Sequence, residues 1–519
     1  MTPAAAQKKK QARVLSMSEI SRTGAKTAIK RAVLFKMVDY LMANPEANIK
    51  KIMSLSDKIL PDNLFGNQRA SFRQLINDEN NWYQLIMKVM HLNPEVMPQL
   101  IKSFLVDGNL LAWPVQEENR KALRCNVPWA ILLDPTSACN LHCTGCWAAE
   151  YGHSIQLTYD EINSIITQGK KLGTHVYIYT GGEPLVRKRD LIRLCEAHQD
   201  CAFLSFTNST LIDEDFCKEM VRVKNFVPAI SVEGIGEATD VRRGEGVFAR
   251  IDRAMELLRE YQLPFGVSCC HTSQNADAIA SEEFFDWLIE KGALFAWIFT
   301  FMPVGHGSTP DLMTTPEQRE HLYHFVREMR EKKPLFVLDF QNDGEFTGGC
   351  IAGGRRYLHI NANGDVEPCV FAHYSNANIR DVSLLDALRS PLFMKYYDNQ
   401  PFDGNNLLRP CPIYENTGAL AKMVEESGAH STDLEHTEDP RELGAKFEER
   451  ARGWDPVAER LWYNGQDGRA KWRARRYVAQ SEADIEKYER NGRVGNVTLD
   501  ERDEDFARIK KAMEEVAAE

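Results

Sequence analysis

The order of apolar runs between Trp129 and Pro334 limits the fold more than any other feature of this sequence. Short runs rich in apolar, β-branched and aromatic residues alternate there with longer stretches of helical periodicity. The six runs are Trp129–Leu133, Val176–Thr180, Phe203–Thr207, Ala229–Val232, Phe265–Cys270 and Phe295–Met302. Strands that alternate with helices form βαβ units, whose strands are parallel. Six units are too few for a closed eight-stranded barrel, so the sequence predicts an α/β fold built on a partial (βα)6 TIM-like barrel.

Two of the helices in this stretch carry a clear start signal. Thr158 is followed three residues later by Glu161, and Thr315 is followed by Pro316 and then Gln318. A hydroxyl at the N-cap and a Glu or Gln three residues on can satisfy each other's backbone N–H groups. We therefore expect helices to begin directly after Thr158 and Thr315.

The remainder of the 519 residues divides by composition. The expected segments are a basic tail over 1–25, a helical domain over 26–124, the α/β domain over 125–345, a small cysteine-containing region over 346–420 and a charged helical extension over 421–519. In the helical domain Ile29, Val33, Met37 and Leu41 form one apolar stripe. This domain is expected to pack on the α/β domain. The alternative is a surface that meets lipid, because basic residues flank its apolar faces.

Charge and hydropathy exclude several classes of protein. The net charge of −11 argues against general binding of nucleic acid. The basic residues at the start are Lys8, Lys9, Lys10, Arg13, Arg22, Lys26, Lys30 and Arg31, with Glu19 the only acid among them. Such a tail is either solvated or in contact with an anionic membrane. The sequence lacks a secretory signal and a membrane-length apolar run, which predicts a cytoplasmic protein, with peripheral contact at the inner face of the membrane as the alternative.

Three cysteines follow the first expected strand at short spacing. Cys139 and Cys143 are separated by three residues, and Cys143 and Cys146 by two. Cysteines in a cytosolic chain indicate metal ligands or small buried side chains rather than disulfides. A structural zinc site needs four protein ligands, whereas a cubane iron–sulfur cluster held by three leaves one iron open. A zinc-stabilised binding protein without a reaction is the remote alternative.

Polar and glycine residues stand where the next strands end. They are Gly181, Gly182, Glu183 and Pro184 after the second strand, Thr207 and Asn208 after the third, and Ser231, Glu233 and Arg243 after the fourth. The carboxyl ends of parallel barrel strands meet at one edge, where the chemistry of such folds lies. The two glycines would let the backbone approach a ligand and leave N–H groups free to bind it, and Glu183 could accept from an ammonium group. Together these residues would surround a zwitterionic, nucleoside-bearing ligand.

This combination resembles the radical S-adenosylmethionine superfamily over about residues 125–345. The resemblance rests on Cys139-x3-Cys143-x2-Cys146 after the first strand and Gly181-Gly182-Glu183-Pro184 after the second. It implies a catalytic [4Fe–4S] cluster on the three cysteines, with S-adenosylmethionine chelating the open iron. Reductive cleavage to a 5′-deoxyadenosyl radical, which takes hydrogen from a substrate, is then expected. An electron donor such as flavodoxin or ferredoxin, and anaerobic conditions, are implied as well.

The resemblance also assigns expected roles to the strand-end residues. Gly181, Gly182 and Glu183 would hold the methionyl group; Ser231, Thr207, Asn208 and Glu233 would reach the ribose or the carboxylate; and Arg243 would reach the carboxylate. One departure stands out, because the family usually has an aromatic residue directly before the last cysteine. Here that position is Gly145, and Trp147 follows Cys146.

A second cysteine region resembles the auxiliary-cluster extensions named SPASM or twitch domains. Cys350 is followed by Gly364 and Cys369 at the spacing of their opening pattern, and Cys411 comes later. Tyr357–Ile360 and Asp365–Val370, joined by the turn Asn361–Gly364, are expected to form a β-hairpin between the first two cysteines. One auxiliary iron–sulfur cluster on Cys350, Cys369 and Cys411 is expected. His373 or an open iron could complete it, with zinc or plain buried thiols as alternatives.

The substrate is less constrained by the sequence. SPASM-type enzymes often modify peptides or proteins, which makes a peptide or protein substrate the leading expectation. The alternative is a lipid or alkyl chain, because the Cys-x3-Cys-x-Gly-Cys pattern also resembles adenosyl-hopene transferases and the N-terminal 113 residues are basic and amphipathic. Cys269, Cys270 and His306 are further candidates to face a substrate, and the remaining cysteines are expected to be core residues.

Overall fold

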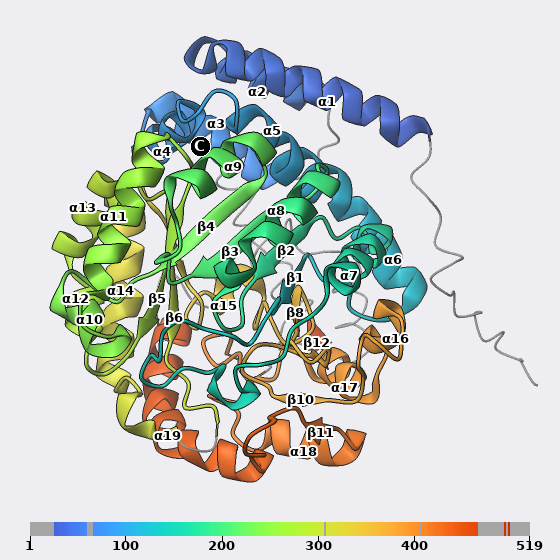
Figure 1. The fold of residues 1–519 in the computed structure, drawn as a ribbon, viewed down its shortest axis with the longest axis vertical. Helices are drawn as coiled ribbons and strands as arrows, with labels where there is room; N and C mark the ends of the chain where they lie inside the picture. The colour runs from blue at the N-terminus through green and yellow to red at the C-terminus, as the bar shows by residue number, and fades with distance from the viewer. Residues whose placement is uncertain are drawn as a thin grey trace, which may run out of the picture.

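A curved parallel sheet forms the centre of the computed structural model (Figure 1). The structure describes residues 25–59, 66–305, 308–403 and 406–464, with two short strands at 493–494 and 497–498. The nine strands are β1 (Ala130–Leu133), β2 (Val176–Tyr179), β3 (Ala202–Thr207), β4 (Phe226–Ser231), β5 (Gly266–His271), β6 (Phe295–Thr300), β7 (Phe336–Asp339), β8 (Tyr357–Ile360) and β9 (Val366–Glu367). Their order is β7-β6-β5-β4-β3-β2-β1-β8-β9, and only β9 runs antiparallel to its neighbour.

Helices cover the outer face of this sheet. The principal ones are α7 (Tyr159–Leu172), α8 (Lys188–Ala197), α9 (Glu214–Val223), α11 (Val247–Glu260), α13 (Glu282–Lys291) and α14 (Pro316–Lys332). Outward-facing strand residues such as Ile131 and Tyr177 are fully buried against apolar helix positions such as Ile165. Both expected capping boxes are present, at Thr158 and at Thr315. The predicted α/β class, the six strands and these two helix starts are confirmed.

The sheet is larger than the sequence predicted. β7 follows the sixth predicted strand, and β8, expected only as one arm of a hairpin, also pairs in parallel with β1. The hairpin itself is present, since β8 pairs with β9 and Gly364 adopts a φ of 87° in the turn. A strand such as β1 would otherwise present unpaired backbone groups at the sheet edge, and β8 removes that edge.

The N-terminal helices close the barrel at the N-terminal ends of its strands. They are α1 (Ala25–Ala43), α2 (Pro45–Ile59), α3 (Gly66–Asp78), α4 (Asn81–Met90), α5 (Met97–Ile101), η1 (Lys102–Leu111) and α6 (Ala112–Leu123). Asn81 donates to the Lys333 carbonyl at 2.9 Å, and the Asn93 N–H donates to the Gln262 carbonyl at 2.9 Å, just ahead of β7 and β5. The helices are therefore at the end opposite the strand C-termini, and α1 and α2 lie along the top of Figure 1.

The C-terminal region packs below the sheet in the same view (Figure 1). Its elements are β10 (Tyr374–Ser375), α16 (Leu384–Leu388), α17 (Pro391–Asn399), α18 (Ala419–Ser427), β11 (His430–Ser431) and α19 (Pro440–Asn464). Trp454 of α19 is buried and donates to the Leu408 carbonyl at 2.9 Å, which anchors the helix to the core. The basic tail expected over 1–25 lies outside the described residues, apart from Ala25. Among the described helices, none combines the length and the apolar character that crossing a bilayer requires.

Candidate active site

The loop after β1, residues 135–148, brings Cys139, Cys143 and Cys146 together; we name it the cysteine loop. Burial, together with the charges of Glu183, Cys146 and Cys143, raises the pKa of the Cys139 thiol to about 11. The pKa of Cys146 is likewise raised by burial and by Cys143. Three converging thiols that repel one another when ionised are a donor set for a metal centre, since thiolates bound to a metal lose that penalty. The three residues therefore fit an iron–sulfur cluster.

Gly181 and Gly182 hold the base of the cysteine loop. The Gly182 N–H donates to the Thr136 carbonyl at 3.0 Å, and the Glu183 N–H donates to the Ala138 carbonyl at 2.8 Å. A Cβ at Gly182 would lie 2.3 Å from the Ala138 oxygen, which no side chain tolerates. The prediction that the N–H groups of the two glycines stay free for a ligand is wrong for Gly182, because its N–H binds the loop. The glycines allow the loop to cross the end of β2 in direct contact.

The Glu183 carboxylate is buried at the end of β2 and accepts three hydrogen bonds. Its oxygens accept from the Thr207 hydroxyl at 2.7 Å, the Asn208 N–H at 2.7 Å and the Leu185 N–H at 2.9 Å. Pro184 begins the short helix η3 (Pro184–Arg187) that Glu183 caps. Burial raises the pKa of Glu183 despite these bonds. Four of the residues expected to bind the cosubstrate thus lie together, tied to one another in this structure.

Asn140 joins this group to the cysteine loop. Its side-chain oxygen accepts from Asn208 at 2.8 Å, and its amide donates to the Thr210 hydroxyl at 2.8 Å. The residue lies directly after Cys139. The ends of β2 and β3 are therefore connected to the first cysteine by side-chain hydrogen bonds.

Glu233 and two arginines form a buried ion cluster on the other side of the loop. Arg243 contacts the Glu233 carboxylate at 2.5 Å and Arg242 at 2.7 Å, while the Cys270 N–H donates to it at 2.8 Å. Burial alone would raise the pKa of Glu233, but Arg243 and Arg242 lower it overall. The expected ligand contacts Glu233 and Arg243 are brought together, but they pair with each other. Ser231, at the end of β4, is half-buried nearby.

Helix α10 (Glu237–Arg243) connects the cluster of Glu233 and the two arginines to the cysteine loop. The Thr144 N–H donates to the Arg242 carbonyl at 2.9 Å, and the Arg242 guanidinium donates to the Gly145 carbonyl at 3.4 Å. Arg243 reaches the Cys143 sulfur at 3.8 Å. The sequence placed Arg242 beside Arg243 near the expected ligand but assigned a specific role only to Arg243. The position of Arg242 in the same basic pair was the only available signal.

The residue that follows β6 explains why position 145 is a glycine. Gly145 has a φ of 66°, which favours glycine, and a Cβ there would lie 2.6 Å from the Phe301 ring. Phe301 is buried and follows β6 directly. An aromatic ring is therefore present at this point of the site, supplied by β6 in place of residue 145.

A buried charged network lies beside Trp147. His359 on β8 contacts Asp134 at 2.9 Å and Glu367 at 2.5 Å, and the Tyr151 hydroxyl donates to Glu367 at 2.9 Å. Burial alone would lower the pKa of His359, but Asp134 and Glu367 raise it to about 10. The Trp147 ring packs against His359 with centroids 5.5 Å apart. No motif indicated this network, because some of its members are more than 200 residues apart along the chain.

His373 belongs to the same region and its ring nitrogens are occupied. Nδ1 contacts Asp433 at 2.6 Å, and Nε2 contacts the Val370 carbonyl at 3.0 Å. The Tyr151 ring stacks on it with centroids 4.6 Å apart. These contacts favour a structural histidine over the alternative of a cluster ligand.

Cys350, Cys369 and Cys411 converge in the C-terminal region and form the auxiliary group. Burial and the neighbouring Cys369 raise the pKa of Cys350 to about 12, and burial with Cys411 raises that of Cys369 to about 12. Tyr396 packs beside them in one core with Cys369 and Cys411. Its buried hydroxyl has no hydrogen-bond partner among the described residues. An orphan hydroxyl beside three thiols fits a site that is completed by a metal cluster.

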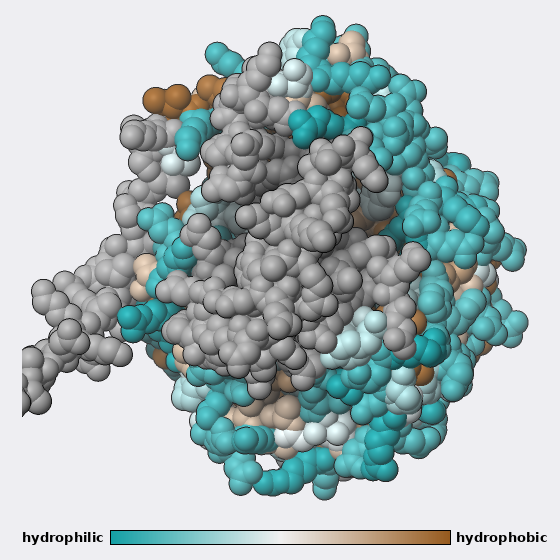
Figure 2. Space-filling model, turned by 180° about the vertical axis from the view of Figure 1, so that it is seen from behind, coloured by the Kyte–Doolittle hydropathy of each residue, from teal (hydrophilic) through white to brown (hydrophobic). Residues whose placement is uncertain are grey.

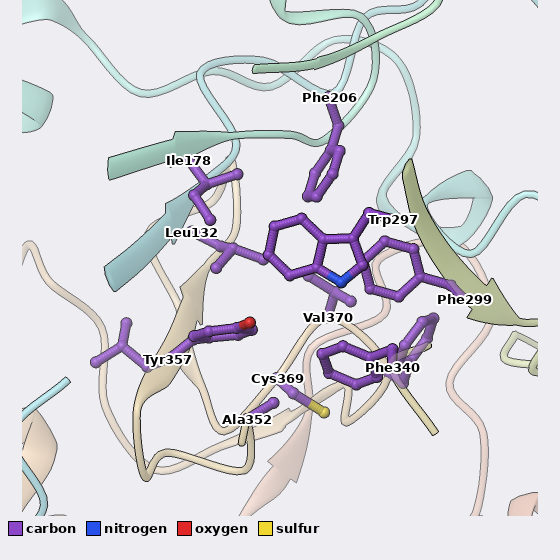
Figure 3. Close-up of a pocket in the computed structure, with 12 residues that line it drawn as sticks. Leu132, Ile178, Phe206, Trp297, Phe299, Phe340, Ala352, Tyr357, Cys369 and Val370 are labelled. Atoms are coloured by element: carbon purple, nitrogen blue, oxygen red, sulfur yellow. The ribbon is translucent and has the colours of Figure 1, made fainter. Parts of the chain in front are cut away.

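The interior of the barrel beside the auxiliary group is apolar. Figure 3 shows its side chains directed toward one another, with Cys369 of the auxiliary group at the lower edge. The lining residues are Leu132, Ile178, Phe206, Trp297, Phe299, Phe340, Ala352, Tyr357, Leu358, Cys369, Val370 and Phe371. None of them is charged. The crevice that they enclose is narrow, about 20 Å³, yet Phe206, Phe299, Phe340 and Phe371 remain partly exposed.

The other cysteines are mostly core residues. Cys125, Cys195, Cys201, Cys217 and Cys269 are buried, as the sequence predicted. Cys270 is partly exposed to solvent; burial of its thiol raises its pKa to about 11, and the charges of Glu233 and the nearby Cys146 contribute. Its place inside the barrel agrees with the expectation that one of the paired cysteines faces the site. His306 lies outside the described residues.

Comparisons with known proteins agree with this geometry. Residues 133–281 match the radical SAM superfamily, and residues 350–412 match SPASM, an iron–sulfur cluster-binding domain. The chain thus carries a radical SAM domain and a SPASM domain. It is therefore a radical SAM enzyme, whose cofactors are a [4Fe–4S] cluster, S-adenosylmethionine and auxiliary iron–sulfur chemistry in the SPASM region.

Individual relatives differ in the substrates that their names imply. An AdoMet-dependent heme synthase of Methanosarcina barkeri is 26% identical over 285 residues, covering 49% of this chain and 80% of the relative. A PqqA peptide cyclase of Bradyrhizobium diazoefficiens is 24% identical over 283 residues, covering 49% and 70%. Among solved structures, Streptococcus suis SuiB bound to its precursor peptide SuiA has a TM-score of 0.45 at 18% identity, covering 58% of this chain and 71% of SuiB.

Proposed function

We propose that this radical SAM enzyme takes a hydrogen atom from an apolar group of a peptide or protein substrate. The observation that carries the proposal is the uncharged, aromatic interior of the barrel, which Cys369 of the auxiliary group borders (Figure 3). Four of its phenylalanines remain partly exposed, and a substrate group would have to widen the crevice in order to enter it. A lining of this kind stabilises an aliphatic or aromatic group by removing it from water, and it penalises a charged group.

Different residues of the chain have different roles at this site. Cys139, Cys143 and Cys146 would hold the catalytic cluster, and the auxiliary group would hold the second. S-adenosylmethionine, when bound and reductively cleaved, supplies the hydrogen-abstracting chemistry. Glu233, through Arg242, keeps the cysteine loop in place, and the aromatic lining excludes water from the reacting groups.

Two arguments favour a peptide or protein. Among the relatives are a cysteine-type anaerobic sulfatase-maturating enzyme of Clostridium perfringens and the PqqA peptide cyclase, whose names refer to protein and peptide substrates. The N-terminal helices, which suggested lipid, lie at the end of the barrel opposite the strand C-termini and the cysteine loop (Figure 1). The heme synthases point elsewhere, but heme carries carboxylates and the lining offers them no basic side chain.

A lipid or alkyl chain is the second candidate, because the same uncharged lining would accept a hydrocarbon. The two candidates can be separated without knowing the substrate. Host cells grown in deuterated medium supply a deuterated peptide and protein fraction and a deuterated lipid fraction. Each is incubated anaerobically with reconstituted enzyme, S-adenosylmethionine and a reductant, and the 5′-deoxyadenosine formed is analysed by mass spectrometry.

Deuterium in 5′-deoxyadenosine from the peptide and protein fraction alone is the expected result. Deuterium from the lipid fraction alone would replace the first candidate by the second. Transfer from a polar small-molecule fraction, with none from the other two, would contradict an apolar reacting group altogether.

A further inference from the structure

Helix α1 exposes an apolar face to solvent. Ile29 is 66% exposed, Val33 51% and Tyr40 47%. These three residues are spaced by four and by seven positions. Each spacing is close to a whole number of helical turns, so their side chains lie along one stripe of the helix. Figure 2 shows hydrophobic atoms gathered over α1 at the upper left edge, among hydrophilic neighbours. Exposed apolar faces of this kind indicate an interaction site.

The opposite face of α1 is fixed to the body of the protein. Val38 is buried, and Arg31 contacts Asp107 of η1 at 2.6 Å. Lys102 contacts Asp39 at 2.5 Å from the same element. One side of the helix is therefore held against the body of the protein, while its apolar stripe faces outward.

The N-terminal 36 residues carry a net charge opposite in sign to that of the rest of the chain. Residues 1–36 contain nine Lys and Arg residues and one acidic residue, a net charge of +8. The whole chain has −11, so the remaining residues carry −19. Lys30 and Lys36 are exposed on α1 beside the apolar stripe. An anionic surface would attract this end alone and repel the rest, which fixes an orientation.

We propose that the outer face of α1, with the basic residues around it, docks on an anionic lipid bilayer. Ile29, Val33 and Tyr40 would enter the headgroup region, while Lys30 and Lys36 contact lipid anions. Charge complementarity and an apolar stripe together select a bilayer, because a nucleic acid would pair with the lysines but would not bury the stripe. The strand C-termini, at the opposite end, then face the aqueous phase, where protein substrates and the electron donor are available.

The test uses the full chain and vesicles of two compositions, phosphatidylcholine alone and phosphatidylcholine with phosphatidylglycerol. Val33→Glu and Val382→Glu form a matched pair, since both add one acid in place of an exposed valine, on α1 and on a distant loop. In flotation assays the wild type should bind only the anionic vesicles, and more weakly at high salt. Ile29→Glu combined with Val33→Glu should weaken binding at least ~10-fold, a cost of about 1.4 kcal/mol, whereas Val382→Glu should not.

Three outcomes of the vesicle assays would overturn the proposal. They are equal or absent binding to both vesicles, equal loss in Val33→Glu and Val382→Glu, and an unchanged affinity of the double variant. A circular dichroism melt shows that each variant is folded. An oligonucleotide that binds more tightly than the anionic vesicles would reassign the face to nucleic acid. The deuterium-transfer result is independent of all these outcomes, so the two proposals fail separately.

Discussion

Replacing Glu233 by Gln tests how the cysteine loop is held. The substitution keeps the shape and the oxygen that accepts from Cys270, but it removes the one negative charge shared by Arg242 and Arg243. Glu233 is fully buried, and the side chains of Arg242 and Arg243 are only 13% and 10% exposed. Water therefore cannot stabilise the guanidinium charges that the substitution leaves without a partner. Removing one partner of such a pair costs roughly 3–5 kcal/mol.

The substitution should loosen the cysteine loop as well as lower the free energy of unfolding of the whole protein. Arg242 provides the carbonyl that accepts from the Thr144 N–H, between two of the cluster cysteines. If the loop opens through this contact, about 3 kcal/mol corresponds to at least ~100-fold faster exchange of the amide. Hydrogen-exchange mass spectrometry on the peptide that contains Thr144 measures it, in the cluster-free protein.

Glu219→Gln is the control for this experiment. Glu219 pairs with Arg222 at 2.7 Å, but both side chains are more than 40% exposed, so the loss should be at most about 1 kcal/mol. The reasoning is refuted if Glu233→Gln leaves the exchange of Thr144 as slow as in the control, because the ion cluster would then not hold the loop.

Other substitutions test separate parts of the site. Gly145→Ala should cost about 1–3 kcal/mol and lower the iron bound at the first group, because the added Cβ meets Phe301 at a positive φ; thermal unfolding and iron analysis measure both, and a wild-type result would contradict the packing. The His359 pKa of about 10 lies above its unfolded value of about 6.5, so its stabilisation should be complete below pH 6.5 and disappear as the pH rises through about 10. Urea midpoints across this range should show that dependence, and the same dependence in His359→Gln would exclude this origin. Tyr396→Phe should shift the reduction potential of the auxiliary cluster, whereas Tyr374→Phe, whose hydroxyl already donates to the Glu438 carbonyl, should not; equal shifts would contradict an orphan hydroxyl that serves the cluster.

Local patterns predicted the parts of the fold that depend on local rules. The six strands, the capping boxes at Thr158 and Thr315 and the hairpin after β8 follow from periodicity and turn chemistry. The pairing of β8 with β1 could not be predicted in this way, since it joins segments more than 200 residues apart. Single-segment patterns carry no information about which distant edge a strand covers.

The same division applies to the candidate site. Cys139, Gly181 and Glu183 could be predicted as site residues because glycines and cysteines at fixed spacing are visible along the chain. Their hydrogen-bond partners were not visible, and so the Gly182 N–H, which was predicted to be free for a ligand, binds the cysteine loop instead. His359 was missed for a related reason, because its acidic partners approach it only in the folded barrel.

Iron and sulfide analysis after anaerobic reconstitution tests the central claim, that two groups of three cysteines each hold a cluster. The wild type should contain about eight iron and eight sulfide per chain, about four for each cubane. Replacing Cys139, Cys143 and Cys146 by Ala should leave about four of each and abolish cleavage of S-adenosylmethionine. Replacing Cys350, Cys369 and Cys411 should also leave about four, with the first cluster retained. Zinc without sulfide, or iron that neither triple substitution lowers, would contradict the account.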